Sequence, residues 1–320
     1  MKKRIAVLTS GGDCSGMNAT IRAVVRAAIS KGIEVFGVYR GFQGLMHFEV
    51  EKLGRKNVSG IINNGGTVLK TARSKEFMTK IGRAKAYRTL KENLIDGLIV
   101  IGGNGSLMGA KTFYEEYKFP VIGIPATIDN DVNGTDFTLG SDTAVNVALD
   151  AIDKIRDTAT SLERVFVVEV MGRECGYIAL NVALAGGCED VLIPEASYDI
   201  HKIAEEITEG NVRGKISWII IVAEGKAKAA IIARHITEIT SLETRVTVLG
   251  HIQRGGRPTA QDRILGTKFG VFAVELLARG IKNKVVGIRN GKLVAISLKN
   301  AIKKSKFESK DYLKLMKVLT

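Results

Sequence analysis

Short runs of consecutive apolar residues alternate along the chain with stretches in which apolar residues recur every three or four positions. Apolar residues on consecutive positions are typical of strands buried on both faces of a parallel sheet. We therefore predict strands at residues 5–8, 35–39, 98–101, 121–124, 165–170, 191–193, 219–222 and 246–249. Two further runs, 285–288 and 293–296, flank Asn290-Gly291, a dipeptide that favours a hairpin turn.

The helical spacing between these runs is clearest at residues 142–157, where apolar residues form one stripe. Ser141 or Asp142 would supply the N-cap of this helix. Strands that alternate with helices predict an α/β fold, here two doubly wound Rossmann-like domains with largely parallel sheets flanked by helices. Ligands in such folds bind at the carboxyl ends of the strands. The strand ends are therefore where a site is expected.

The composition is that of a folded globular protein, with 45% hydrophobic and 25% charged residues. The longest unbroken apolar run, 218–223, is too short to cross a bilayer. Residues 1–4 resemble the start of a signal peptide in charge, but no long apolar stretch follows them. The three scattered cysteines suit neither a disulfide framework nor a zinc site. These features favour a cytoplasmic protein.

The net charge of +14 is compatible with nucleic acid, an anionic membrane surface or small polyanionic substrates. The basic residues are spread along the chain without a block of five or six, and only 6% of residues are aromatic. Stacking platforms for bases are therefore few. The sequence favours phosphorylated metabolites as ligands over nucleic acid.

Two glycine-rich segments follow predicted strands and precede helices. The first contains Gly11-Gly12-Asp13, and the second spans 102–106. Glycines at such a turn let backbone N–H groups and a helix N-terminus approach an anion, although each segment alone is equally consistent with a tight turn. Neither matches the dinucleotide or P-loop fingerprints. Their recurrence at two strand ends predicts a phosphate-rich ligand.

A third strand end carries two carboxylates, Asp129 and Asp131. If the segment is extended, both side chains point the same way. Such a pair suits a base for a substrate hydroxyl and a ligand for Mg²⁺, direct or through water. An EF-hand calcium loop is excluded because its twelfth position is Gly140. A structural Asx-turn remains an alternative, but it explains only one of the aspartates.

Cationic residues stand near other predicted element ends. Arg73 follows a glycine turn and Arg173 follows a strand, while Arg245 begins a strand that ends in the segment 250–256. Planar guanidinium groups match phosphate oxygens, and His251 could add a hydrogen bond to a phosphate or hydroxyl. A lone arginine is usually a surface residue, but this recurrence indicates anion binding.

Taken together, six motifs resemble the bacterial type of ATP-dependent 6-phosphofructokinase. They are LTSGGD (8–13), GMNATIR (16–22), IGGNGS (101–106), PATIDND (125–131), VEVMGR (168–173) and GHIQRGG (250–256). They occur in order, and the resemblance extends from the N-terminus to about residue 300. The combination is highly specific, whereas no single motif would be.

The resemblance implies a glycolytic kinase that transfers the γ-phosphoryl group of ATP to the 1-hydroxyl of fructose 6-phosphate. Asp129 would accept the hydroxyl proton, and Thr127 and Asp131 would support the site and the Mg²⁺ ion. The remaining catalytic residues would be Gly12, through its backbone N–H, Arg73 and Arg173. These roles agree with phosphoryl transfer, which consists mostly of positioning and charge neutralisation.

The same resemblance assigns three groups of binding residues. The ATP site would comprise Gly12, Arg73, Gly103, Asn104, Gly105 and Ser106. The fructose 6-phosphate site would comprise Thr127, Asp129, Arg164, Met171, Gly172, Arg173, Glu224, Arg245, His251 and Arg254, with Arg164 and Arg245 supplied by a neighbouring subunit of a homotetramer. An effector site for ADP or phosphoenolpyruvate would comprise Arg22, Arg26, Arg55, Arg156, Arg213 and Lys215.

The chain departs from the family pattern at a few positions. Asn104 replaces the usual aspartate, so it offers Mg²⁺ an amide oxygen without charge. Ala126 and Gly105 stand where pyrophosphate-using relatives carry lysine and aspartate, which favours ATP as the donor. The alternatives are a pyrophosphate-dependent phosphofructokinase and a catalytically silent, phosphometabolite-binding regulatory subunit.

The length of 320 residues suits two domains, and no Pro/Gly/Ser-rich linker separates them. We therefore expect interwoven domains. Residues 1–140 plus about 253–303 would form a larger nucleotide-binding domain. Residues 141–252 plus about 304–320 would form a smaller sugar-phosphate-binding domain.

Overall fold

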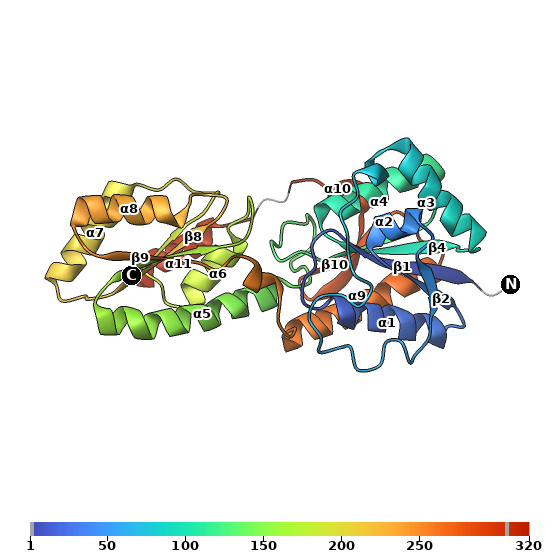
Figure 1. Cartoon of the computed structure of the whole chain (residues 1–320), viewed down its shortest axis with the longest axis horizontal. Coiled ribbons are helices and arrows are strands. Elements are labelled where there is room, and N and C mark those ends of the chain that lie inside the picture. The colour runs from blue at the N-terminus through green and yellow to red at the C-terminus, as the bar shows by residue number, and fades with distance from the viewer. Residues whose placement is uncertain (1–2, 305–306, 320) are drawn as a thin grey trace. The chain divides into compact units, whose positions relative to one another are not determined.

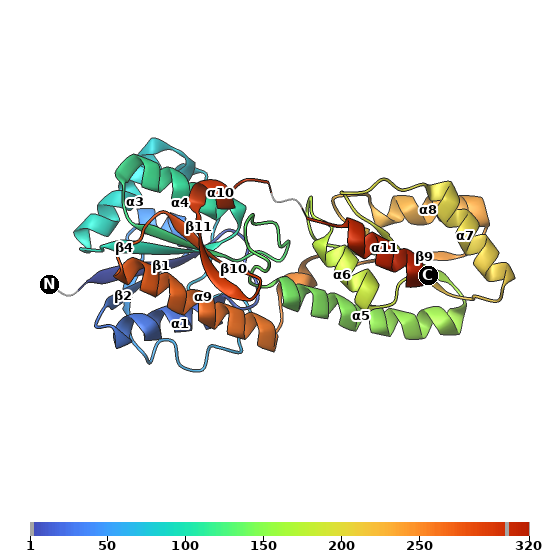
Figure 2. The same cartoon turned by 180° about the vertical axis from the view of Figure 1, so that it is seen from behind.

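The computed structural model describes residues 3–304 and 307–319, so residues 1–2, 305–306 and 320 of the predicted domains lie outside it. The described residues fall into two units (Figures 1 and 2). The first unit contains residues 3–143 and 254–304, and the second contains residues 144–253 and 307–319. The chain thus leaves the first unit after Thr143, returns at Arg254 and ends in the second unit.

A seven-stranded sheet forms the centre of the first unit, in the order β11-β10-β5-β4-β1-β2-β3. The strands are β1 (Arg4–Ser10), β2 (Glu34–Val38), β3 (Val50–Leu53), β4 (Gly97–Gly102), β5 (Val121–Pro125), β10 (Lys284–Arg289) and β11 (Lys292–Ser297). Only the outer strands β3 and β11 are antiparallel to their neighbours. No strand was predicted at β3, because its charged residues interrupt the run of apolar positions that marks the other strands.

Helices cover both faces of this sheet (Figure 1). One face carries α1 (Met17–Ser30) and α9 (Ala260–Ala278). The other carries α2 (Gly41–Met46), α3 (Lys80–Glu92), α4 (Asn104–Tyr117) and α10 (Leu298–Ala301), with the 3₁₀ turn η1 (Glu76–Met78) beside them. Alternate strand residues such as Ala6 and Leu8 enter the core beneath α2, α3 and α4.

The second unit has a four-stranded parallel sheet in the order β7-β8-β6-β9. Its strands are β6 (Val165–Val170), β7 (Asp190–Leu192), β8 (Trp218–Ala223) and β9 (Thr244–Val248). Its helices are α6 (Tyr177–Ala185), α7 (Ile200–Val212), α8 (Ala229–Thr240) and α11 (Lys310–Leu319), together with most of α5 (Ser141–Leu162) and the 3₁₀ turn η2 (Gly250–Arg254). The side chains of Val165 and Ile220 pack with those of α7 and α8 in one buried cluster.

The predicted α/β class with parallel sheets is confirmed, and each predicted strand overlaps an observed one. The hairpin at Asn290-Gly291 also forms, with Ile288 paired to Leu293. None of the helices in the described ranges combines the length and apolar character needed to cross a bilayer.

The start of α5 differs from the prediction. The Ser141 hydroxyl donates to the carbonyl of Thr138, and the Asp142 carboxylate accepts from the Thr259 hydroxyl, so neither of these bonds caps the helix. Instead, the Asp262 carboxylate on α9 accepts hydrogen bonds from the backbone N–H groups of Gly140 and Thr143. The beginning of this helix is therefore capped by a residue more than 100 positions away, which a local sequence pattern cannot reveal.

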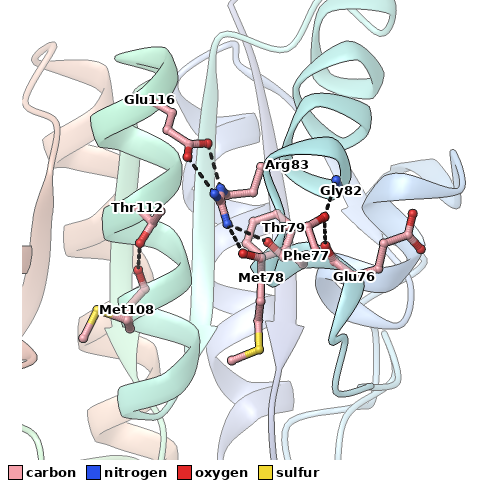
Figure 3. A network of polar contacts seen from close by, with 9 residues as sticks. All are labelled: Glu76, Phe77, Met78, Thr79, Gly82, Arg83, Met108, Thr112 and Glu116. Carbon is pink, nitrogen blue, oxygen red and sulfur yellow. Dashed lines mark hydrogen bonds and ion pairs between the residues drawn. The ribbon is translucent and has the colours of Figure 1, made fainter.

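A buried arginine joins η1, α3 and α4 (Figure 3). Arg83 is 8% exposed. Its Nε and Nη2 donate to the two carboxylate oxygens of Glu116 at 2.7 and 2.6 Å, and its Nη1 donates to the carbonyls of Phe77 and Met78 at 3.1 and 2.6 Å. The guanidinium thus fixes η1 against α4, while the Thr79 hydroxyl caps α3 by accepting from the N–H of Gly82.

Replacing Arg83 with Met should lower the free energy of unfolding at pH 7 by about 2–4 kcal/mol, because two carbonyls and a carboxylate lose their donors. Arg83 holds the pKa of Glu116 below its ordinary value of 4.5. This stabilisation is therefore present above pH 4.5 and is lost as the pH falls through the lower pKa of the folded state. Urea denaturation of wild type and variant should give a difference that narrows below pH 4.5.

Arg88→Met is the matched control on the same helix. Arg88 pairs with Glu92 at the surface, where its side chain is 74% exposed. Its removal should change the free energy of unfolding by no more than about 0.5 kcal/mol. Equal losses for the two variants would contradict a specific role for the buried guanidinium.

Candidate active site

Three adjacent strands of the first unit place the predicted motifs at one edge of the sheet. β1 pairs in parallel with β4, and β4 pairs in parallel with β5. The loops after these strands, which begin at Gly11, Gly103 and Ala126, therefore lie side by side. The strand that follows β1 in sequence, β2, lies on the opposite side of β1 from β4. The chain therefore adds strands on one side of β1 and then on the other. Ligands of doubly wound sheets usually bind where the strand order reverses in this way.

The loop after β1 is shaped by glycine. Gly11 has a φ of +90°, a conformation that side chains disfavour. A Cβ atom on Gly12 would collide with the guanidinium of Arg254, whose Nη1 lies 3.5 Å from the carbonyl of Asp13. The structure therefore brings together Gly12 and Arg254, two predicted site residues from opposite ends of the sequence.

The loop after β4 leads directly into α4, whose N-cap is Gly103. Asn104, Gly105 and Ser106 form the first turn of this helix, so their N–H groups stand at its positive end. The Ser106 hydroxyl donates to the carbonyl of Ser10 at 2.9 Å and joins this turn to β1. The first two loops thus form one surface suited to phosphate.

The loop after β5 is not extended, so the condition under which Asp129 and Asp131 were expected to point the same way is not met. Asn130 between them has a φ of +49°, which turns the chain. Asp129 is 2% exposed, and its N–H donates to the Thr127 hydroxyl at 3.2 Å. That hydroxyl lies 3.5 Å from Oδ1 of Asp131. The Thr127 hydroxyl therefore links the backbone of Asp129 to the carboxylate of Asp131.

Residues 3–304 and 307–319 contain no group of three His, Cys, Asp or Glu side chains suited to binding a metal. Mg²⁺, however, is commonly held by one or two protein oxygens together with substrate phosphates. The Asn104 amide donates to the carbonyl of Asp131 at 3.2 Å, and its Oδ1 is buried without a hydrogen-bond partner among the described residues. An amide oxygen next to the Asp131 segment fits a magnesium ion brought in by phosphates.

Arg73 lies on a loop rather than at a strand end. Two residues earlier, the Thr71 hydroxyl donates to the carbonyl of Gly11 at 2.9 Å. Four residues later, the N–H of Phe77 donates to the Ser74 hydroxyl, and Arg83 holds the Phe77 carbonyl. The exposed Arg73 side chain is thus carried by a segment that is fixed on both sides beside the first glycine loop.

In the second unit, predicted sugar-phosphate residues follow neighbouring strands. Met171, Gly172 and Arg173 follow the central strand β6. The N–H of Met171 donates to the buried Gln253 amide at 2.8 Å. The N–H of Arg173 donates to the Glu224 carboxylate at 3.1 Å, and Glu224 itself follows β8.

His251 follows β9 and is exposed on η2. Because β8, β6 and β9 are neighbours in the sheet, His251 belongs to the same carboxyl edge as Glu224 and Met171. This edge therefore gathers most of the sugar-phosphate residues that were predicted for the second unit.

Arg164 and Arg245 lie at the opposite edge of that sheet. Arg164 immediately precedes β6, and Arg245 is the second residue of β9. Both pair with the carboxylate of Glu243, Arg164 at 2.7 Å. The six residues of β6 place them about 20 Å from Met171. They cannot contact the same small molecule as the carboxyl-edge residues of their own chain.

The predicted effector residues are divided between the units. Arg22 and Arg26 lie on α1 and Arg55 on an exposed loop of the first unit. In the second unit, Arg156 donates to the carbonyls of Gly186 and Gly187 at 2.6 and 2.8 Å. The other two residues form ion pairs, Arg213 with Glu209 and Lys215 with Glu189.

The three cysteines, Cys14, Cys175 and Cys188, are buried, and no disulfide joins them. Cys14, in the first glycine loop, donates to the carbonyl of Leu139 at 3.2 Å. Burial raises its thiol pKa well above the ordinary value and raises the pKa of Cys188 to about 12. Cys14 and Cys188 therefore act as buried packing groups.

The sequence missed the importance of Asp262, which joins α9 to the start of α5. Thr259 and Asp262 have the spacing of a capping box, and the N–H of Asp262 indeed donates to the Thr259 hydroxyl. That signal predicts only the start of α9. The bonds from Gly140 and Thr143 to the Asp262 carboxylate appear only in the fold. Burial raises the pKa of Asp262, a shift that its donors partly oppose.

Replacing Asp262 with Asn should lower the free energy of unfolding by about 2–4 kcal/mol, because an amide NH₂ would face backbone N–H donors that need an acceptor. Urea denaturation would measure this loss. Asp150→Asn on α5 is the control, since its pair with Lys154 is exposed and worth no more than about 0.5 kcal/mol. A loss at Asp262 as small as that of the control would show that the cap is dispensable.

Comparison with known proteins identifies relatives along nearly the whole chain. The family model described as phosphofructokinase matches residues 4–277. An ATP-dependent 6-phosphofructokinase from Natranaerobius thermophilus is 54% identical over 97% of this chain and 96% of its own length. One from Bacillus subtilis is 57% identical over 91% of this chain and 91% of its own length.

A solved structure of phosphofructokinase from Saccharomyces cerevisiae superimposes on the chain with a TM-score of 0.90 and 36% identity. The match covers 99% of this chain and 47% of the yeast chain. This chain therefore spans about half the length of that relative, while it spans almost all of the two bacterial ones.

Proposed function

The chain belongs to the phosphofructokinase family, and we propose that it transfers the γ-phosphoryl group of ATP to the 1-hydroxyl of fructose 6-phosphate. The observation that carries this proposal is the buried Asp129 beside two glycine loops at adjacent strand ends. A carboxylate there can remove a hydroxyl proton while backbone N–H groups hold phosphates.

In the proposed reaction, the sugar 1-oxygen forms a bond to the γ-phosphorus as the bond between this phosphorus and the β–γ bridging oxygen breaks. The hydroxyl proton passes to the Asp129 carboxylate, and ADP leaves with the bridging oxygen. The Gly12 N–H, Arg73 and Arg173 neutralise charge on the transferring group. Thr127 holds the N–H of Asp129 and so orients the base.

ATP is assigned to the first unit, where its phosphates would bind Gly12 and Arg73 together with Gly103, Asn104, Gly105 and Ser106. Asp131 and Asn104 would hold Mg²⁺, which neutralises phosphate charge when it is bound. The bacterial relatives described as ATP-dependent 6-phosphofructokinases support ATP over pyrophosphate as the donor.

Fructose 6-phosphate is assigned to the carboxyl edge of the second unit, with Met171, Gly172, Arg173, Glu224 and His251, together with Arg254 of the first unit. Arg164 and Arg245 belong to the opposite edge, so we assign them to the sugar phosphate bound by a neighbouring copy. This division supports a homotetramer in which each site is completed by another subunit.

We further assign ADP or phosphoenolpyruvate, as effectors, to the cationic residues Arg22, Arg26, Arg55, Arg156, Arg213 and Lys215. The three reduced, buried cysteines support a cytoplasmic location.

The test is formation of fructose 1,6-bisphosphate by the purified protein with Mg²⁺, comparing ATP with pyrophosphate. Turnover with ATP is expected, and Asp129→Ser should lower kcat about 10²–10⁴-fold because the general base is lost. Turnover with pyrophosphate alone would overturn the donor assignment. No turnover with either donor would favour the silent regulatory subunit, and near-normal turnover of folded Asp129→Ser would refute the assigned base.

The shared site makes a separate prediction. Asp129→Ser and Arg245→Ala should each be nearly inactive alone, yet their co-expression in equal amounts should restore about a quarter of wild-type activity, because random assembly creates sites that lack neither residue. The assay is turnover of the purified mixed oligomers. If Arg245 serves its own chain instead, no intact site can form and no activity returns.

A further inference from the structure

The loop between β5 and α5 is closed by contacts between its two ends. The N–H of Leu139 donates to the carbonyl of Pro125, and the N–H of Thr127 donates to the carbonyl of Leu139, both at 3.1 Å. Residues 127–138 therefore leave the sheet edge and return to it. Asp129 lies near the beginning of this loop, so its direction depends on how the loop is held.

Thr138 bonds to the chain on both sides of Asp129. Its side chain is fully buried. Its hydroxyl oxygen lies 2.7 Å from the carbonyl of Thr127 and 3.0 Å from Oδ1 of Asn130. One hydroxyl proton serves one acceptor at a time, and the shorter distance favours Thr127. The Thr138 N–H donates to Oδ1 of Asn130 at 2.8 Å, so Thr138 bonds to Thr127 and to Asn130 at the same time.

Asn130 holds the turn between the two carboxylates. Its left-handed φ of +49° is disfavoured for most side chains but accessible to asparagine. Its Oδ1 accepts from Thr138, and its amide NH₂ donates to the carbonyl of Asp136 at 3.0 Å. The side chain thus stabilises the same backbone conformation that separates Asp129 from Asp131.

We propose that Thr138 and Asn130 are positioning residues that hold the Asp129 carboxylate in the direction needed to accept the sugar proton. This inference rests on the proposed function, since it gives Asp129 the role of the base. Neither residue needs to touch a substrate. They act through the backbone on either side of Asp129.

A positioning role differs measurably from a purely structural one. Loss of the Thr138 hydroxyl should misdirect the base and lower the rate of the chemical step without changing how either substrate binds. A residue that only stabilises the fold would instead reduce the fraction of folded protein, and the turnover number per folded molecule would stay constant.

Thr138→Val removes the hydroxyl with little change of shape. We expect kcat to fall about 10–100-fold, while KM for ATP and for fructose 6-phosphate each stay within about threefold of wild type. Thr138→Ser restores the hydroxyl and should recover kcat to within about threefold. Thr112→Val on α4 is the matched control, because its hydroxyl bonds only a carbonyl of its own helix, and its kcat should match wild type.

A double variant tests whether the effect passes through the base. In the Asp129→Ser background, adding Thr138→Val should lower kcat by no more than about twofold, because the group being positioned is already absent. A full additional loss in the double variant, a rise in KM equal to the loss of kcat, or failure of serine to rescue would each overturn the proposal.

Hydrogen–deuterium exchange separates this inference from the proposed function. The Thr138→Val variant should exchange faster at residues 127–131 than wild type, whether or not the protein turns over. If wild type produces no fructose 1,6-bisphosphate, the proposed function fails and with it the catalytic role of the positioning residues. Unchanged exchange at 127–131 in an active enzyme would refute the positioning role of Thr138 and leave the proposed function standing.

Discussion

The parallel pairing of β1, β4 and β5 is the constraint on which the proposed active site depends. Hydrogen bonds between these strands align Ser10 with Gly102, and Gly102 with Pro125. Three loops that are separated by up to about 115 residues therefore begin at the same level of one edge. Side-chain contacts such as Ser106 with Ser10 then refine an arrangement that the backbone has already set. A shift of register by one residue would displace the loop of one strand relative to the others and turn the side chains of that strand to the opposite face.

The sequence indicated the strands because buried parallel strands are apolar at consecutive positions, and the strand ends then indicated where chemistry gathers. It did not show the direction of Asp129 and Asp131, since the extended geometry assumed for them is broken by the left-handed turn at Asn130. It also did not show that Asp262 caps α5, because the two segments meet only after the sheet has formed. Local spacing therefore predicts elements, whereas contacts between distant segments decide which groups within them are functional.

The positive charge of the chain has more than one use. Arg83 neutralises a partly buried carboxylate and holds two carbonyls, and Arg156 donates to two carbonyls of a turn. These arginines act as multiple hydrogen-bond donors within the fold, for which the planar guanidinium is better suited than the lysine ammonium. The cations of the chain are therefore not all available to ligands. Cations such as Arg73, which are exposed on fixed segments, are better candidates for binding phosphate.

The burial of all three native thiols has a practical consequence for spectroscopy. Thiol-directed dyes and spin labels react with exposed thiolates, and here burial keeps Cys14 and Cys188 protonated at neutral pH. The chain therefore offers a nearly silent background for labelling. A single cysteine introduced at a solvent-exposed position could carry a fluorophore or nitroxide without first removing the natural ones. Conformational changes during turnover could then be followed in an otherwise unaltered sequence.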